Sequence, residues 1–204
     1  MGRIVYPHLS SQLFKTDISL HEVWVANGGI VGRGVLLDYA SWAATQGLHP
    51  SPLTTHSIPL SDLKKVAAAQ NVVFRPNDIL FIRSGYINAL ASLSAEDGPA
   101  YAAKRDAIPA IGVESGRDML QWIWENEFAA VAGDMIAFEA LPFQDKQFWL
   151  HEWLLAGWGL PIGELFDLER LASECRRVGK WSFFFSSVPL NVSHCIMYLG
   201  IVHC

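Results

Sequence analysis

Four short, mainly apolar runs along the chain have the length of buried β-strands. The runs are Val35–Tyr39, Ile79–Ile82, Phe128–Ala132 and Trp181–Phe185; glycine or a charged residue precedes each of them, and glycine or a polar residue follows all but the first. Continuous apolar runs of this length are typical of strands that are buried on both faces. The pattern therefore predicts a sheet that is largely covered by other elements.

Amphipathic segments alternate with these runs. Apolar residues recur three and four positions apart in segments 61–69, 115–126 and 165–177, which is the spacing of one helix face. Ser61 is expected to cap the first helix. The residues expected to face the core are Leu63, Val66 and Ala67, then Met119, Trp122 and Ile123, and finally Leu165, Leu168, Leu171, Ala172 and Cys175. Because strands and helices alternate, the predicted fold class is α/β.

Two segments are predicted to lie outside the regular core elements. The glycines of Asn27–Gly34 are not spaced as a dinucleotide fingerprint, and a strand rather than a helix follows them, so we interpret them as turn glycines. Segment 94–107 has a helical but polar pattern, interrupted by Gly98 and Pro99. It is predicted to form a surface excursion or a lid.

His151 lies at the start of a predicted helix. On a helix, Leu154, Leu155 and Trp158 would share its face, since residues three, four and seven apart line one stripe. A buried imidazole without a partner costs about 1–3 kcal/mol, so His151 requires one. Two interpretations are open at this point: a core histidine bonded to a backbone carbonyl, or a metal ligand.

Glu164 follows His151 by thirteen residues, after a turn through Gly159, Pro161 and Gly163. An imidazole and a carboxylate brought together by a turn could form half of a divalent metal site. Alternatively, Glu164 is an acid near the positive N-terminus of the helix predicted over 165–177. His151 and Glu152 do not begin a zincin motif, because leucine stands at the fifth position.

Two further charged residues follow buried strands. Arg83 ends the run Ile79–Ile82 and is either an ion-pair partner or an anion-binding residue for a substrate. Asp134 comes just after the run Phe128–Ala132, where a carboxylate could serve chemistry, a turn or a cap.

Composition limits the possible functions. The 204 residues suit a single domain, and 51% hydrophobic residues argue against disorder. A formal charge of −5 and no Lys/Arg cluster argue against nucleic-acid binding. The start of the sequence does not have the apolar core of a signal peptide, no apolar run is long enough for a membrane span, and the three cysteines do not form a disulfide framework. We therefore expect a soluble, cytoplasmic protein.

Four ordered blocks resemble a known family. They are Gly32–Asp38, Asp78–Gly85, Val131–Asp134, and Leu150–Leu155 continuing through Ile162–Glu164. Together they resemble the Putative cyclase family, which includes bacterial kynurenine formamidase and isatin hydrolase, and the resemblance is nearest to its fungal branch. It covers about residues 20–191 of a single cyclase-like domain, 1–204.

The resemblance implies a swivelling β/β/α fold, usually assembled as a homo-oligomer. It also implies metal-dependent hydrolysis of a C–N bond in a small aryl formamide or cyclic amide, as in tryptophan catabolism. Zinc or manganese would activate water in such a reaction. His151 matches the family's downstream metal histidine and Glu164 its metal carboxylate, while Arg83 is a candidate for binding substrate. The residue that holds the second nitrogen of His151 cannot be read from the sequence.

The chain departs from the family pattern at both ends. The family's upstream metal motif, of the type His-x-Gly-Thr-His-x-Asp or, in fungal members, Trp-Asp-Gly-x-x-His, has no match before Gly32. Neither His8 nor His21 can be carried over as a ligand. Residues 192–204 form an atypical tail, so we expect a fold that is incomplete at both ends, from a gene model that starts late and ends in an intron. The catalytic acid or base is therefore unknown.

With two carried-over ligands, this chain is expected to bind metal weakly and turn over slowly, since a catalytic zinc normally has three protein ligands. The alternative is a non-catalytic family member that binds a small molecule or another subunit. His194, Cys195, His203 and Cys204 lack the spacing of a zinc finger.

Overall fold

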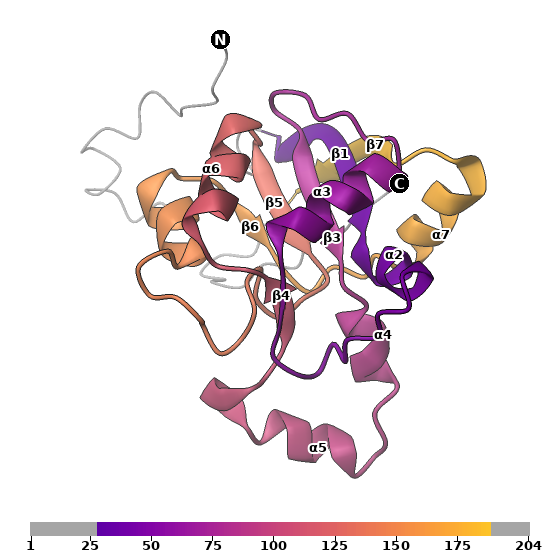
Figure 1. The fold of residues 1–204 in the computed structure, drawn as a ribbon, viewed down its shortest axis with the longest axis vertical. Coiled ribbons are helices and arrows are strands. Elements are labelled where there is room, and N and C mark those ends of the chain that lie inside the picture. Colours follow the sequence, from indigo (N-terminus) through magenta and orange to yellow (C-terminus); the bar gives the residue numbers. More distant parts are fainter. Residues whose placement is uncertain (1–27, 189–204) are drawn as a thin grey trace.

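The computed structural model describes residues 28–188, which form a mixed α/β fold around a mostly parallel sheet (Figure 1). The strand order is β6-β5-β3-β1-β7, and only β7 runs antiparallel to its neighbour β1. The bounds are β1 Ile30–Asp38, β3 Ile79–Arg83, β5 Ala130–Gly133, β6 Ile162–Gly163 and β7 Ser182–Ser187. A second, two-stranded parallel sheet pairs β2 (His56–Ile58) with β4 (Ile111–Val113). The predicted α/β class is confirmed.

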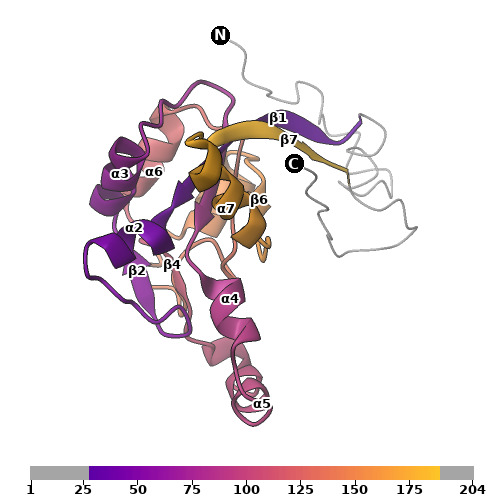
Figure 2. The ribbon, with the colours of Figure 1, turned by 90° about the vertical axis from the view of Figure 1, so that its right-hand side faces the viewer.

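Helices cover both faces of the larger sheet, as Figure 2 shows. The helices are α2 Tyr39–Thr45, α3 Leu60–Ala69, α4 Tyr86–Ala91, α5 Asp97–Ala102, α6 Arg117–Glu125 and α7 Glu169–Val178, with a 3-10 turn at Arg105–Ala107 and a π-helix at Glu152–Gly157. Alternate residues of a strand point to opposite faces. Leu37 and Leu80 accordingly pack in the core under α3 and α6, whereas Leu36 and Phe81 pack in the core under α7.

The first two amphipathic helices form where the pattern predicts them. In α3 and α6 the buried residues include all six that were expected to face the core: Leu63, Val66, Ala67, Met119, Trp122 and Ile123. The capping prediction for Ser61 is wrong. The helix starts one residue earlier, at Leu60, and Pro59 occupies the N-cap in an extended conformation without a side-chain cap. Ser61 therefore lies inside the first turn.

The third amphipathic helix starts later than predicted. Leu165 has a positive φ of 56° and is 50% exposed, and α7 begins only at Glu169. Leu168, Leu171, Ala172 and Cys175 are buried as expected. The backbone N–H groups of Leu165 and Phe166 donate to the carbonyls of Met135 and Gly133, which prevents this stretch from turning into a helix. Glu164 thus follows β6 and does not lie at a helix N-terminus.

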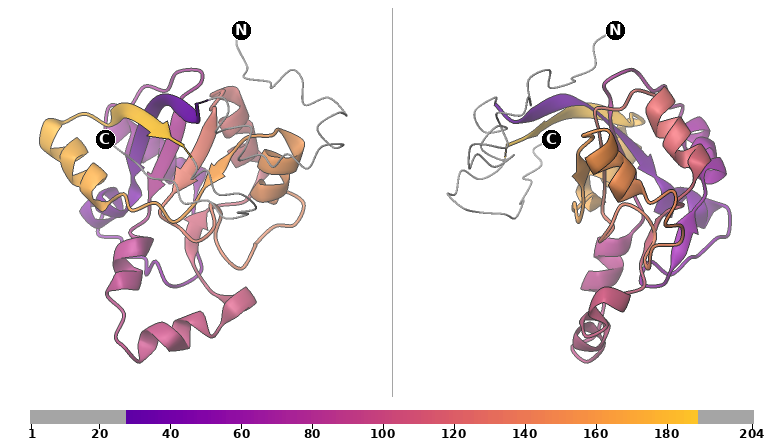
Figure 3. Two further views of the ribbon diagram at one scale, coloured as in Figure 1. Left: turned by 180° about the vertical axis from the view of Figure 1, so that it is seen from behind. Right: turned by 90° about the vertical axis from the view of Figure 1, so that its left-hand side faces the viewer.

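The glycines of segment 27–34 are turn residues only in part. Gly28 and Gly29 have positive φ, but Gly32 and Gly34 lie within β1, where they pair with β7. A side chain at Gly34 would clash with the ring of Phe183. Glycine at position 34 therefore allows the ring of Phe183 to approach the backbone of β1 closely. The interpretation of these glycines as turn residues did not predict this contact. Figures 2 and 3 show this part of β1 and β7 extending beyond the rest of the sheet.

The helix after His151 has wider turns than the sequence pattern assumed. Residues 152–157 form a π-helix, in which Leu154 is buried but Leu155 is 47% exposed, and Trp158, just after the helix, is half-buried. The stripe predicted for an α-helix is therefore wrong at Leu155, because a π-helix rotates successive side chains by a smaller angle.

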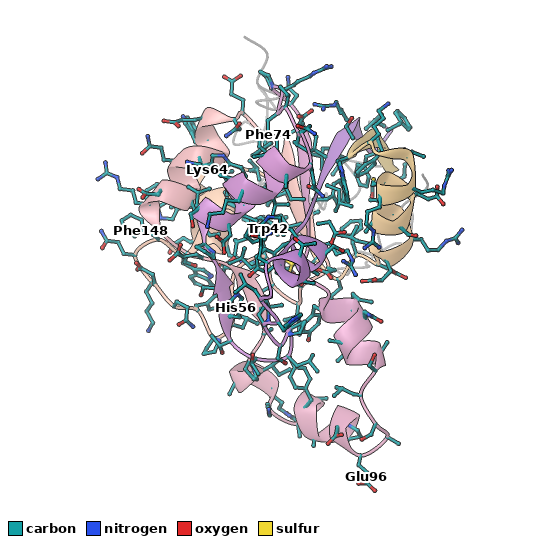
Figure 4. All side chains as sticks on the ribbon, turned by 45° about the vertical axis from the view of Figure 1, so that its right-hand side comes forward. Trp42, His56, Lys64, Phe74, Glu96 and Phe148 are labelled. Carbon is teal, nitrogen blue, oxygen red and sulfur yellow. The ribbon has the colours of Figure 1, made fainter. Side chains whose placement is uncertain are left out.

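The polar segment 94–107 projects from the body of the protein, and Figure 4 shows Glu96 pointing outward at its tip. Gly98 and Pro99 lie inside α5 and do not interrupt it. The role of this segment as a lid stays a prediction. Within residues 28–188, no helix has both the length and the apolar character needed to cross a membrane.

Candidate functional site

Polar residues meet where the parallel strands end. Asp38 and Arg83 are the last residues of β1 and β3, and Asp134 and Glu164 directly follow β5 and β6. In open α/β sheets, ligands bind outside the carboxyl ends of the strands. This edge is therefore where the fold would place a site. Glu164 pairs with His151, Arg83 pairs with Asp38, and Asp134 makes a third, separate set of contacts.

His151 and Glu164 are in direct contact. The imidazole Nε2 lies 3.0 Å from Glu164 Oε1, and the two side chains are 23% and 32% exposed. The turn through Gly159 and Pro161 returns the chain so that β6, which includes Gly163, pairs with β5, and Glu164 follows β6 directly. The pair predicted from the sequence is thus brought together, and part of it remains accessible to solvent.

Glu139 holds the other side of the His151 ring. Its Oε2 lies 2.7 Å from Nδ1 of His151, its Oε1 accepts the backbone N–H of His151 at 3.1 Å, and its side chain is fully buried. A carboxylate that accepts the second ring N–H of a metal-binding histidine sets the tautomer and the orientation of the ring. Glu139 was not predicted. The available signal was a single charged residue in the apolar stretch Met135–Leu141, since a buried glutamate requires a partner.

These contacts exclude the core-histidine interpretation of His151. Its partners are two carboxylates rather than a backbone carbonyl, and its side chain reaches the surface. With Glu139 accepting from Nδ1, the free electron pair of a neutral imidazole lies on Nε2, the atom that faces Glu164.

The two side chains lie near enough to bind one ion after a small movement. Zinc binds nitrogen and carboxylate oxygen at about 2.0–2.2 Å, so two such atoms at a tetrahedral angle are roughly 3.4 Å apart. The observed 3.0 Å is a hydrogen-bond distance and is shorter than this separation. Across the part of the chain that the structure describes, no group of three or more His, Cys, Asp and Glu side chains could hold a metal. His8, His21 and the tail 192–204 lie outside the described residues.

Two carboxylates also change the titration of His151. Burial lowers its pKa, but the hydrogen bonds and charges of Glu139 and Glu164 outweigh burial and raise the pKa to about 9. At neutral pH in the absence of metal, the ring is therefore an imidazolium that donates to both carboxylates. A divalent cation would have to displace the proton on Nε2, so metal binding should release a proton.

This pKa predicts how the stability of the metal-free protein depends on pH. The pKa of histidine is about 6.5 in an unfolded chain. Because the pKa of His151 is higher in the folded protein, protonated His151 stabilises the fold fully below about pH 6.5. This stabilisation is lost as the pH rises through about 9. Thermal unfolding with EDTA between about pH 6 and pH 10 should show a falling midpoint. The fall should be smaller in His151→Gln, and an equal fall in both proteins would contradict this origin.

Gly112 of β4 packs directly against the backbone of Glu139. The backbone of Val113 bonds to Phe138 and Ala140, and a side chain at Gly112 would collide with the backbone of Glu139. Gly112→Ala is expected to lower the free energy of unfolding by about 1–3 kcal/mol, because the packed strand has little room to move. It should also weaken metal binding by displacing Glu139.

The matched control is Gly116→Ala, since a side chain there would meet open space. Urea unfolding and metal titration of both variants check the prediction. Equal behaviour of the two variants would show that the contact at Gly112 is tolerated.

Arg83 is enclosed by carboxylates. Its Nη1 donates to Asp38 at 2.7 Å, and its Nε and Nη2 donate to Glu169 of α7 at 3.0 and 2.7 Å. Burial lowers the pKa of Arg83, but both carboxylates outweigh it, so the net pKa is raised further above its ordinary value. The ion-pair alternative is therefore realised. Arg83 also lines a cavity of about 240 Å³ next to α2, and neither His151 nor Glu164 lines this cavity. Its role in substrate binding stays a prediction.

Asp134 has a structural role. Its buried carboxylate accepts the backbone N–H groups of Ser84, Gly85 and Tyr86 and the hydroxyl of Ser84 at 2.7–3.0 Å. These contacts join the end of β5 to the start of α4. Of the two alternatives for this residue, the structure thus favours a cap over direct chemistry.

The sequence profile described as Putative cyclase matches residues 11–140, a range that ends before His151 and Glu164. No curated protein matches the chain in sequence. A crystal structure described as a novel cyclase has 30% identity and a TM-score of 0.70, covering 88% of this chain and 54% of that one.

Two isatin hydrolases share the fold. The enzyme from Labrenzia aggregata, bound to benzyl benzoate, has 13% identity and a TM-score of 0.60, covering 90% of this chain and 64% of its own. Another, bound to the product analogue thioisatinate, has 14% identity and a TM-score of 0.56, covering 87% and 61%. The chain thus spans roughly 54–64% of the length of these structures. Its profile match, covering more than half of the sequence, shows that the chain belongs to the Putative cyclase family.

Proposed function

We propose that this chain is a metal-dependent hydrolase, or part of one, that cleaves the C–N bond of a small aryl formamide or cyclic aromatic amide. The observation that carries the proposal is the 3.0 Å contact between His151 Nε2 and Glu164 Oε1, with the ring held by buried Glu139. Family membership and the fold shared with isatin hydrolases support it.

His151 and Glu164 would supply two metal ligands, one nitrogen and one oxygen, a set that suits zinc or manganese. Such an ion supplies a Lewis acid that activates water and polarises the amide carbonyl. Glu139 keeps the Nδ1 proton of His151 and thereby leaves Nε2 as a donor atom for the metal. Glu164, which directly follows the short strand β6, is positioned by the sheet rather than by a helix terminus.

Metal titration and hydrolysis assays test the proposal. The 204-residue protein, stripped with EDTA, is titrated with Zn²⁺ or Mn²⁺ by calorimetry and then assayed with N-formylkynurenine and with isatin. We expect metal-dependent hydrolysis of at least one substrate, with a loss of binding in the His151→Gln and Glu164→Gln variants. Metal binding that is the same in the wild-type protein and both variants would overturn the assignment of the ligands.

A second candidate is a non-catalytic family member that binds a small molecule or a subunit. The number of potential metal ligands favours it. Among the described residues only two candidate ligands, His151 and Glu164, lie together, whereas a catalytic zinc ordinarily has three protein ligands. Protein purified without added metal distinguishes the two functions. Bound zinc or manganese together with turnover would support the hydrolase. A protein that has no bound metal and shows no turnover would support the non-catalytic function. Assembly as a homo-oligomer and a cytoplasmic location stay predictions, and size-exclusion chromatography tests the first of these.

A further inference from the structure

Two aromatic rings adjoin His151. The ring centroids of Phe143 and Trp149 lie 6.0 and 6.4 Å from the His151 ring, and 4.6 Å from each other. Phe143 is 40% exposed, so one side of this aromatic cluster is accessible from solvent next to the candidate ligands. The two rings come from the two ends of segment 143–149, which connects the region of Glu139 to the π-helix.

The segment that carries these rings is held by specific contacts. Asp145 accepts the backbone N–H of Gln147 at 2.8 Å, and the indole N–H of Trp153 donates to the carbonyl of Gln147 at 3.1 Å. Trp153 therefore has the acceptor that a tryptophan normally finds when it packs against a protein surface.

Trp149 differs from Trp153 in this respect. Its Nε1 is buried, and within residues 28–188 no group accepts its hydrogen. Most buried polar groups in proteins are paired, because leaving a donor unpaired costs about 1–3 kcal/mol. Such a donor beside a candidate active site has the chemistry to bind a ligand oxygen, provided that the groups covering it move aside when the ligand binds.

We propose that Phe143 and Trp149 form the aryl-binding wall of the His151 site and are specificity-determining residues for the proposed hydrolase. The ring of Phe143 packs against the planar aryl group of the substrate, and Trp149 Nε1, which is closed to solvent in the free protein, is uncovered when the substrate binds and donates to a substrate oxygen. This inference rests on the proposed function, and it adds the side chains that would recognise an aromatic amide. An aliphatic amide of the same size would lack the contact with Phe143.

The first test compares two formamides that differ in aromaticity. Formanilide and N-cyclohexylformamide carry the same amide on rings of similar size. Phe143→Leu should lower kcat/KM for formanilide about threefold to tenfold and leave that for the cyclohexyl compound within about twofold, since aromatic pairing is the contact removed. Trp149→Phe keeps a ring but removes the N–H, and should raise KM about fivefold for both compounds.

Matched controls come from aromatic residues outside this cluster. Phe184→Leu alters an exposed phenylalanine of β7, and Trp124→Phe alters a tryptophan of α6. Both should leave the two kcat/KM values within about twofold of wild type. Circular dichroism verifies that each variant is folded. If Phe143→Leu affects both substrates equally, or affects neither, the inference is overturned while hydrolysis itself stands.

A binding measurement separates the inference from the proposed function. Calorimetry with thioisatinate requires no turnover, and the dissociation constant should rise about threefold to tenfold in Phe143→Leu and in Trp149→Phe. That result without any hydrolysis would refute the hydrolase and retain the aryl site. Absence of thioisatinate binding to the wild-type protein, or binding that neither variant weakens, would refute the aryl site.

Discussion

Replacing Arg83 by methionine is expected to lower the free energy of unfolding by about 3–5 kcal/mol, because buried Asp38 then keeps only the longer of its two ion pairs, the one with Arg176 at 4.0 Å. Asp38 is almost fully buried, and its Oδ2 has no hydrogen-bond partner among the described residues even with Arg83 present. Glu169 would lose the same guanidinium, and α7 would lose its ion pair with β3. Thermal unfolding should show a fall in the midpoint of roughly 10 °C.

The matched control for this variant is Arg177→Met. Arg177 pairs with Glu174 on the exposed surface of α7, where solvent screens the ion pair, so this variant should unfold close to the wild-type midpoint. The comparison also tests the substrate-binding alternative for Arg83. A variant that is nearly as stable as the control but has a strongly raised KM would show that Arg83 serves the ligand rather than the fold.

The position of Arg83 illustrates what a strand pattern can predict. The apolar run Ile79–Ile82 indicated a buried strand, and a charge at its end had to be paired or functional. The run could not identify the partners, since Asp38 and Glu169 lie 45 and 86 residues away. A local pattern predicts a helix or a strand. The residues that become ion-pair partners depend on how the strands and helices are arranged in the folded protein.

The same limit applies to the candidate site. His151 and Glu164 were predicted by a resemblance to family motifs, and the turn between them explains their contact. Glu139 was missed, because its relation to His151 is created by the backbone pairing of segment 138–140 with β4, which no local pattern reveals. The π-helix was also missed. Its sequence has an α-helical spacing of apolar residues, so the register shift that exposes Leu155 depends on tertiary packing.

Glu139 is therefore the residue on which the site can be tested most sharply. Glu139→Gln is expected to weaken Zn²⁺ binding about 10- to 100-fold without removing a ligand, because an outer carboxylate sets the tautomer and basicity of a metal-binding histidine. Glutamine has the size of glutamate and can still accept one hydrogen bond. A loss of Zn²⁺ affinity in this variant therefore results from the missing negative charge and not from a cavity. Titration of the EDTA-treated protein at a fixed pH measures the change.

A double-mutant cycle with His151→Gln decides whether Glu139 acts through the imidazole. His151→Gln alone should weaken Zn²⁺ binding about 100-fold or more, since the metal loses a ligand that is itself oriented by a carboxylate. If Glu139 acts only by orienting His151, then Glu139→Gln should have almost no further effect in the His151→Gln background. Additive losses would instead mean that Glu139 reaches the metal independently. The proposed arrangement, in which one carboxylate binds the ion and the other holds the ring, would then be wrong.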